Sequence, residues 1–140
     1  MKVYNGEGMV LGRLASLVAK DTLLGEEVRV VNCEKVYISG NKVLTVANEK
    51  QKRDRKGYPL KSAKFTRLPD RCVRRTIRGM LPWKHARGKE AFKRVMCYVG
   101  VPEGLSNEKM IAIDKHSVSK LPTLKYTTVG YYCKALGGKL

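Results

Sequence analysis

The sequence predicts an α/β fold in which a helix connects two strands of a small parallel sheet. Residues 12–24 have helical periodicity, whereas residues 28–33 form a short β-branched run typical of a strand buried on both faces. An apolar segment precedes the helix, so strand, helix and strand succeed one another as in a βαβ unit. The 140 residues allow one hydrophobic core, because a chain of this length buries roughly 70% of the surface that its unfolded form exposes. We therefore expect one domain.

The other elements follow from apolar spacing and from residues that end helices. The first helix places Leu14, Ala15 and Val18 on one face, and Gly25 supplies its stop. Residues 42–47 satisfy neither the helical nor the strand period cleanly, and we favour a helix there. The remaining expected elements are apolar segments at 36–40, 111–113 and 126–128, helices at 69–80 and 88–94, a strand at 95–99, and a final helix from Val129 to Gly137 and Gly138.

Charge is concentrated in one third of the sequence. The formal net charge is +17, and residues 50–94 hold seventeen Lys and Arg residues against three acidic ones, Asp54, Asp70 and Glu90. Because a concentrated basic block attracts a polyanion, it indicates a nucleic-acid partner. A basic block can also bind an anionic membrane, but that mode needs large apolar residues opposite the charges on one helix.

Residues 49–68 are expected to form a basic loop inserted in the domain. Lys, Arg, Gly57, Pro59 and polar residues replace the apolar pattern there, so this segment cannot contribute to a core. We expect it to face solvent or to become ordered on a partner. Pro69 then opens the next helix.

The helix at 69–80 carries a stripe of arginines. The spacing i, i+3, i+4 and i+7 places four of them on one face: Arg71, Arg74, Arg75 and Arg78. The opposite face, with Val73, Ile77 and Met80, is expected to dock on the domain. A solvated helix face is the alternative, but such faces normally alternate in sign, and this stripe contains no acidic residue. The stripe therefore favours phosphate groups as ligands.

Aromatic residues interleave the basic block at Tyr58, Phe65 and Trp83. RNA recognition often adds base stacking to phosphate contacts, and Trp83 is the best candidate for it. Equally, Trp83 could be a hydrophobic plug that packs the turn at Pro82 onto the domain. Tyr58 and Phe65 could likewise anchor the loop internally.

The cysteines indicate neither a metal site nor a disulfide framework. They are spread along the chain without a CxxC pair: Cys33, Cys72, Cys97 and Cys133. We expect reduced core thiols, no metal and no cofactor. The N-terminus lacks a signal-type apolar region, and no segment approaches the roughly 20 apolar residues that span a bilayer, so we expect a cytoplasmic protein.

A glycine pattern permits an alternative function, a small Rossmann-like nucleotide-binding enzyme. Gly6, Gly8 and Gly12 surround the start of the first helix and Glu34 follows the second strand, a loose variant of the dinucleotide fingerprint. However, 140 residues leave little room for a substrate site. In the simpler interpretation Gly6 and Gly8 form a turn, and Gly12 lets the helix start close to the sheet. His85 has no convincing catalytic partner in the sequence.

Several stretches resemble the large-subunit ribosomal protein thirteen family. The most specific reads Arg75-Thr76-Ile77-Arg78-Gly79-Met80-Leu81-Pro82-Trp83 and continues through 87–94 to Tyr98-Val99-Gly100-Val101-Pro102. The N-terminal third contributes Leu11-Gly12-Arg13-Leu14-Ala15-Ser16, then Val30-Val31-Asn32, Glu34-Lys35 and Ile38-Ser39-Gly40. Trp83 and the tail Lys125-Tyr126-Thr127-Thr128-Val129-Gly130 look like the archaeal and eukaryotic branch. We expect the archaeal type, because no long C-terminal extension is present.

The resemblance implies a single three-layer α/β/α domain around a small parallel sheet, with a basic RNA-facing loop and helices. It implies a structural constituent of the large ribosomal subunit that binds and stabilises folded large-subunit ribosomal RNA, during assembly and in the mature cytoplasmic ribosome. Neighbouring large-subunit proteins are implied as further partners. Catalysis, a small-molecule substrate and a membrane are not implied.

The two lines of reasoning predict one set of RNA-binding residues. Carried over by motif, these are Arg75, Arg78, Trp83, Lys84, Arg87 and Lys93. Charge and position in the basic block add Lys50, Lys52, Arg53, Arg55, Lys56, Tyr58, Lys61, Lys64, Arg67, Arg71, Arg74, His85, Lys89 and Arg94.

Overall fold

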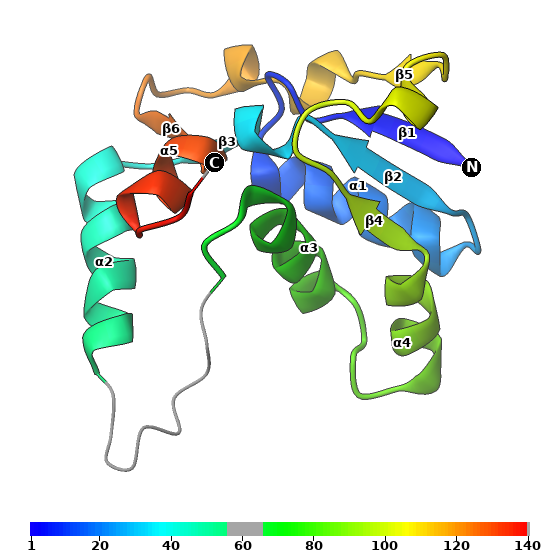
Figure 1. Cartoon of the computed structure of the whole chain (residues 1–140), viewed down its shortest axis with the longest axis horizontal. Coiled ribbons are helices and arrows are strands. Elements are labelled where there is room, and N and C mark those ends of the chain that lie inside the picture. Colours follow the sequence, from blue (N-terminus) through cyan, green and yellow to red (C-terminus); the bar gives the residue numbers. More distant parts are fainter. Residues whose placement is uncertain (56–65, 140) are drawn as a thin grey trace.

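A parallel sheet forms the centre of the molecule. The computed structural model describes residues 1–55 and 66–139. Four parallel strands lie in the order β4-β2-β1-β5, and β3 pairs with β6 in a separate antiparallel ribbon (Figure 1). The strands are β1 (Lys2–Asn5), β2 (Val28–Val31), β3 (Tyr37–Ser39), β4 (Val95–Cys97), β5 (Met110–Ile111) and β6 (Tyr126–Thr128).

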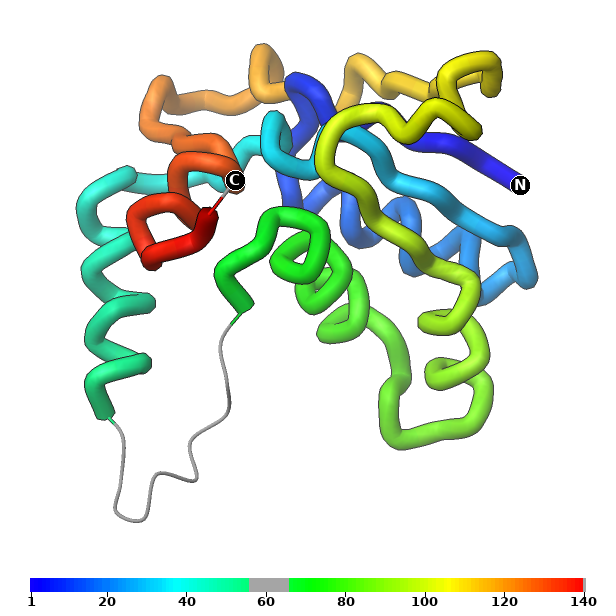
Figure 2. The backbone as a smooth tube through the Cα atoms, viewed as in Figure 1, coloured from blue at the N-terminus to red at the C-terminus, as the bar shows by residue number. Residues whose placement is uncertain are grey.

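Helices cover one face of this sheet. They are α1 (Leu11–Leu23), α2 (Lys42–Asp54), α3 (Pro69–Met80), α4 (Ala86–Lys93) and α5 (Val129–Ala135). Helix α1 packs on α3 and α4 beneath the sheet, whereas α2 and α5 lie beside this group (Figure 1). The chain that leaves β4 crosses the other side of the sheet, adds β5 at the opposite edge and then returns to β6 (Figure 2). That second outer layer consists of irregular chain and short 3-10 turns.

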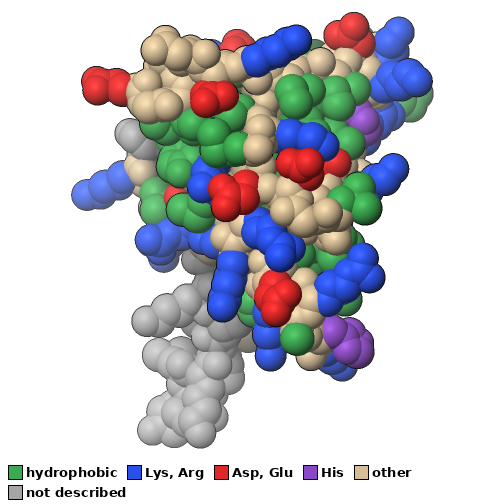
Figure 3. Space-filling view, turned by 90° about the vertical axis from the view of Figure 1, so that its right-hand side faces the viewer, with side chains coloured by type: hydrophobic (Ala, Val, Ile, Leu, Met, Phe, Trp, Pro, Cys, Tyr) green, Lys and Arg blue, Asp and Glu red, His purple; other side chains and the backbone are tan. Residues whose placement is uncertain are grey.

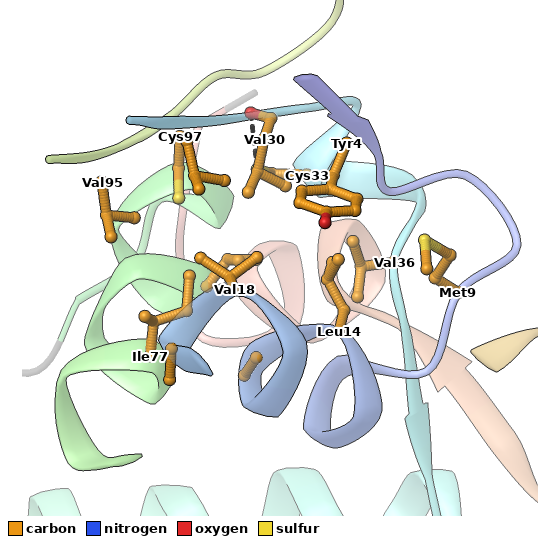
Figure 4. Packing of buried hydrophobic residues seen from close by; sticks show 14 of the residues in the cluster. Tyr4, Met9, Leu14, Val18, Val30, Cys33, Val36, Ile77, Val95 and Cys97 are labelled. Atoms are coloured by element: carbon orange, nitrogen blue, oxygen red, sulfur yellow. Dashed lines mark hydrogen bonds between the residues drawn. The ribbon is translucent and has the colours of Figure 1, made fainter. Parts of the chain in front are cut away.

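The core lies between the sheet and the helices. Register pairs Val28 with Val95 and Val30 with Cys97, so these side chains share the face that points toward the helices (Figure 4). They meet fully buried residues of α1 and α3, including Leu14 and Ile77. Burying a side chain of this size contributes roughly 1.5–3 kcal/mol, so this packing fixes the orientation of α3 on the domain.

The predicted mixed α/β fold is confirmed, together with the βαβ unit, since β1 and β2 are parallel and α1 connects them. The helices favoured at 42–47 and predicted at 69–80 are also present. Small differences in bounds occur at α4, which begins at Ala86, and at β4, which ends at Cys97. The prediction that Met80 docks on the domain is wrong, because this last residue of α3 is 42% exposed.

The prediction of a loop from residue 49 is wrong for its first part, because α2 continues to Asp54. Asn41 caps this helix: its side chain accepts a hydrogen bond from the Val43 N–H at 3.0 Å. Lys, Gln, Glu and Arg are good helix formers, so residues 49–53 extend a capped helix without burying any side chain. Residues 56–65 of the predicted loop lie outside the described part of the chain.

Candidate nucleic-acid interface

Helix α3 is oriented by its apolar side. Pro69 occupies the first turn, where its fixed backbone angle favours a helix start. Val73 and Ile77 are fully buried, which turns the arginine stripe away from the core. Arg71 and Arg78 are exposed at the centre of the stripe, and the residues at its edges are half-buried.

Two aromatic rings contact arginines of the stripe. The rings of Trp83 and Phe92 meet edge to face, with centroids 5.1 Å apart and an interplanar angle of 90°. The Arg74 guanidinium lies 4.6 Å from the Phe92 centroid, and that of Arg78 lies 5.2 Å from the Trp83 centroid. Trp83 therefore packs in the connection between α3 and α4, while 41% of it remains exposed. Its predicted stacking on RNA remains a prediction.

The connection from α3 to α4 is a compact turn. The His85 N–H donates to the Pro82 carbonyl at 3.0 Å. A Cβ on Gly88 would lie 2.2 Å from that carbonyl oxygen, so only glycine permits α4 to approach the turn this closely. The result is that basic side chains of the turn and of α4 are exposed together: Lys84, His85, Arg87, Lys89 and Lys93.

These exposed residues and the arginine stripe form one surface, here named the basic face: Arg71, Arg74, Arg75, Arg78, Lys84, His85, Arg87, Lys89 and Lys93. In the space-filling view, acidic side chains are mixed with basic ones in the upper part of the molecule, and basic ones predominate in the lower part (Figure 3). Neighbouring guanidinium groups repel one another, so an anion between them would relieve this repulsion.

Helix α2 faces the other edge of α3 across a cavity that Glu49, Lys52 and Arg75 help to line. Lys50 and Lys52 of this helix are exposed, as is Arg55 directly after it. The Arg53 guanidinium instead donates to two backbone carbonyls, at 3.0 Å to Leu136 and 3.2 Å to Thr66. These bonds connect α2 to the end of α5 and to the segment before α3.

Arg53 and Arg94, which were also predicted to bind RNA, donate hydrogen bonds to backbone carbonyls of the domain. Arg53 holds α2 as described, and Arg94 donates to the Thr22 carbonyl of α1 at 3.3 Å. Arg67 is exposed. The remaining predicted contacts lie outside the described residues: Lys56, Tyr58, Lys61 and Lys64. For all of these, RNA contact remains a prediction.

A second basic and aromatic cluster was missed from the sequence. Lys42 Nζ lies 3.7 Å from the centroid of the Tyr131 ring, and Tyr37 meets Tyr126 edge to face at 5.1 Å. The four side chains line an open cavity of about 330 Å³. No sequence signal could have found it, because α2, α5 and the β3–β6 ribbon bring together residues far apart in the chain.

The glycine pattern does not build a nucleotide site. A Cβ on Gly6 would lie 2.6 Å from Val36 Cγ2, so this glycine serves close packing. Gly12 is exposed with no atom near its Cβ position, so the prediction that it lets the helix start close to the sheet is wrong. Glu34 accepts a hydrogen bond from the Gly100 N–H at 3.0 Å, an internal partner instead of a ribose.

The cysteines are free, and the predicted core position holds for Cys33, Cys97 and Cys133. Cys72 is only half-buried. Within residues 1–55 and 66–139, no three His, Cys, Asp or Glu side chains gather as a metal site would require. In the same part of the chain, none of the helices has the length and apolar character to cross a bilayer.

Comparison with known proteins decides the family. The sequence model described as Ribosomal protein L13 matches residues 1–104. The chain belongs to the ribosomal protein L13 family. A protein of Methanococcus maripaludis named large ribosomal subunit protein uL13 is 49% identical, and one of the same name from Methanocaldococcus jannaschii is 46% identical; each alignment covers 99% of both chains. A third, from Archaeoglobus fulgidus, is 41% identical over 96% of this chain and 86% of its own length.

These relatives agree with the resemblance found in the sequence. All three come from archaea, which agrees with the archaeal type expected from the sequence. The matched region contains β1, α1, β2, α3 and α4, and thus the whole basic face. A Rossmann-like enzyme is not supported by the family or by the positions of Gly12 and Glu34.

Proposed function

We propose that this L13 chain is a structural constituent of the large ribosomal subunit and binds large-subunit ribosomal RNA through the basic face. The observation that carries the proposal is the coincidence of family and geometry: the region matched by the family model holds an exposed cationic surface on a well-packed domain. The role is non-enzymatic. In the cytoplasmic ribosome, neighbouring large-subunit proteins are its further partners.

The domain supplies rigidity and the basic face supplies charge. Val73 and Ile77 fix α3 on the core, while Phe92 and Trp83 hold Arg74 and Arg78 in place beside it. Side chains held in this way lose less conformational entropy when they contact phosphates. We infer that residues 1–140 act as one unit, with Lys50 and Lys52 of α2 and the following Arg55 adding charge at the edge of the face.

Recognition follows the shape and backbone of folded RNA. The major groove of an A-form helix is too deep and narrow for side chains to read the bases. Guanidinium and ammonium groups therefore contact phosphates and ribose hydroxyls. Neutralising phosphates from two neighbouring RNA helices would lower their repulsion and stabilise their packing during subunit assembly.

Sedimentation of a cell lysate tests this proposal. The untagged protein is expected to sediment with the large ribosomal subunit and to remain bound through a moderate salt wash. A variant with Arg71, Arg74, Arg75 and Arg78 replaced by Gln is expected to leave the subunit at lower salt, because each lost phosphate contact weakens binding. Unmodified protein found free at the top of the gradient would contradict the ribosomal role.

A further inference from the structure

Two of the cysteines form a contact between helices. Helix α3 packs on α5. Cys133 of α5 is fully buried, and Cys72 of α3 packs against the same cluster. The two thiols lie close enough to act on one another, because Cys133 lowers the pKa of Cys72 and Cys72 raises the pKa of Cys133. Two reduced thiols thus lie side by side, although sixty residues separate them in the sequence.

One of these two thiols is accessible. Cys72 is half-buried and lines an open cavity of about 260 Å³. The other described residues of its lining are Glu49, Lys52, Thr66, Arg75, Thr76 and Tyr132. A small molecule can therefore approach Cys72 from this cavity, whereas Cys133 is completely buried and does not line it. This asymmetry resembles the division between an attacking and a resolving thiol.

The environment of the pair supports the same division. The pKa of the Cys72 thiol is lowered, first by the hydrogen bond from Cys133 and then by the nearby Arg75 charge, against the opposing effects of burial and of Glu49. The pKa of Cys133 is raised by its hydrogen bond to Cys72 and by burial. The accessible sulfur is thus the one that ionises first, and thiolate is the reactive form.

We propose that Cys72 and Cys133 form a reversible dithiol site that reacts with low-molecular-weight disulfides. The Cys72 thiolate attacks one sulfur of the disulfide, which releases one thiolate and leaves a mixed disulfide on Cys72. The Cys133 sulfur then attacks the Cys72 sulfur and displaces the second thiolate. Two protein thiols are oxidised to one disulfide, the small disulfide is reduced to two thiols, and the two thiol protons pass to the leaving groups.

The chain contains an internal control for this proposal. Cys97 likewise raises the pKa of Cys33, whose Sγ donates to the Val30 carbonyl at 3.6 Å, but both cysteines lie in the core between sheet and helices (Figure 4). Cys33 is completely buried, and Cys97 is 8% exposed. The thiols of Cys33 and Cys97 are near each other but are shielded from solvent. They should therefore resist reagents that oxidise Cys72 and Cys133.

The test treats the folded protein with oxidised glutathione, quenches with acid, alkylates the remaining thiols under denaturing conditions and maps the peptides. The expected product has lost about two mass units and contains a Cys72–Cys133 disulfide, with Cys33 and Cys97 alkylated. The Cys133→Ser variant should accumulate glutathione on Cys72, because no thiol resolves the mixed disulfide. The Cys97→Ser variant should still form the Cys72–Cys133 disulfide.

A second measurement on the unmodified protein does not depend on the folding of any variant. Without denaturant, iodoacetamide should alkylate Cys72 at least about tenfold faster than Cys33, because access and thiolate content both favour Cys72. A folded protein that forms no Cys72–Cys133 disulfide would overturn the proposal. A disulfide that forms first between Cys33 and Cys97, or equal alkylation rates for Cys72 and Cys33, would overturn it as well.

Discussion

Helices α1 and α2 have the same length of thirteen residues but opposite relations to the fold. Helix α1 buries six residues between the sheet and α3, whereas α2 buries none. Two cationic side chains attach α2 to its neighbours: Arg53 donates to two carbonyls, and Lys42 lies over the Tyr131 ring. Core packing thus fixes α1, and a few charged side chains fix α2.

The difference between α1 and α2 separates the part of the chain that stabilises the fold from the part that carries the basic side chains. Apolar burial needs no partner and is not screened by salt as charge interactions are, so α1 and the sheet form a support that exists before RNA binds. The basic side chains of α2 and α3 cannot contribute such burial, and their mutual repulsion is relieved by an anion. The basic region is thus stable only because it is built on the apolar one.

The largest expected effect compares one substitution in the two helices. Leu14 of α1 is completely buried, and Leu44 of α2 is 60% exposed. Leu14→Ala should lower the free energy of unfolding by about 2–5 kcal/mol, since it leaves a cavity in the core. Leu44→Ala should change it by less than about 0.5 kcal/mol. Urea denaturation measures both, and similar losses would contradict the proposed difference between the helices.

The turn between α3 and α4 gives a second contrast, between two glycines. Gly88→Ala would place a methyl group 2.2 Å from the Pro82 carbonyl oxygen, so a loss of about 1–3 kcal/mol is expected. Gly79→Ala in α3 meets no neighbouring atom, and alanine favours the helix, so stability should be unchanged or slightly raised. Thermal unfolding distinguishes them, and an equal stability of the two variants would exclude the tight turn.

A smaller effect is expected at the attachment of α2. Arg53→Gln removes the bonds to the Leu136 and Thr66 carbonyls, so a loss of about 1–2 kcal/mol is expected. Amide exchange should accelerate mainly in α2 and α5. The matched variant Arg55→Gln changes an exposed residue of the same charge and should have little effect. Unchanged exchange in Arg53→Gln would show that other contacts hold α2.

The smallest effect is expected on the exposed side of α1. Gly12→Val should alter stability by less than about 0.5 kcal/mol, because no atom lies near the added group. The result also bears on the nucleotide-site alternative, since the parent protein should show no saturable binding of a dinucleotide. Measurable dinucleotide binding that the Gly12→Val substitution abolishes would support the alternative of a nucleotide-binding enzyme.

Much of the fold could be predicted because buried stripes leave a periodic signal. Leu14 and Val18 mark α1, and Val73 and Ile77 mark α3. Helix α2 leaves no such signal, so the sequence predicts a loop over its second half. The attachment through Arg53 was also beyond prediction, because its acceptors are backbone carbonyls that any residue carries.

The site was predictable in charge but not in arrangement. The spacing of Arg71 and Arg78 predicts a shared exposed face, since it depends only on helix geometry. The stacking of Arg74 on Phe92 depends on the angle between α3 and α4, which is set by the close approach of Gly88 to Pro82. Local sequence patterns carry no information on that angle.

The most direct test of the basic face is the salt dependence of binding to a large-subunit ribosomal RNA transcript from the same organism. The double variant Arg71→Gln and Arg78→Gln should lower the slope of log K against log salt by roughly two, or about one per lost phosphate contact. The control Lys20→Gln and Lys109→Gln removes the same charge from exposed positions outside the basic face and should leave the slope nearly unchanged. Equal slopes for the two double variants would contradict the assignment of RNA binding to this face.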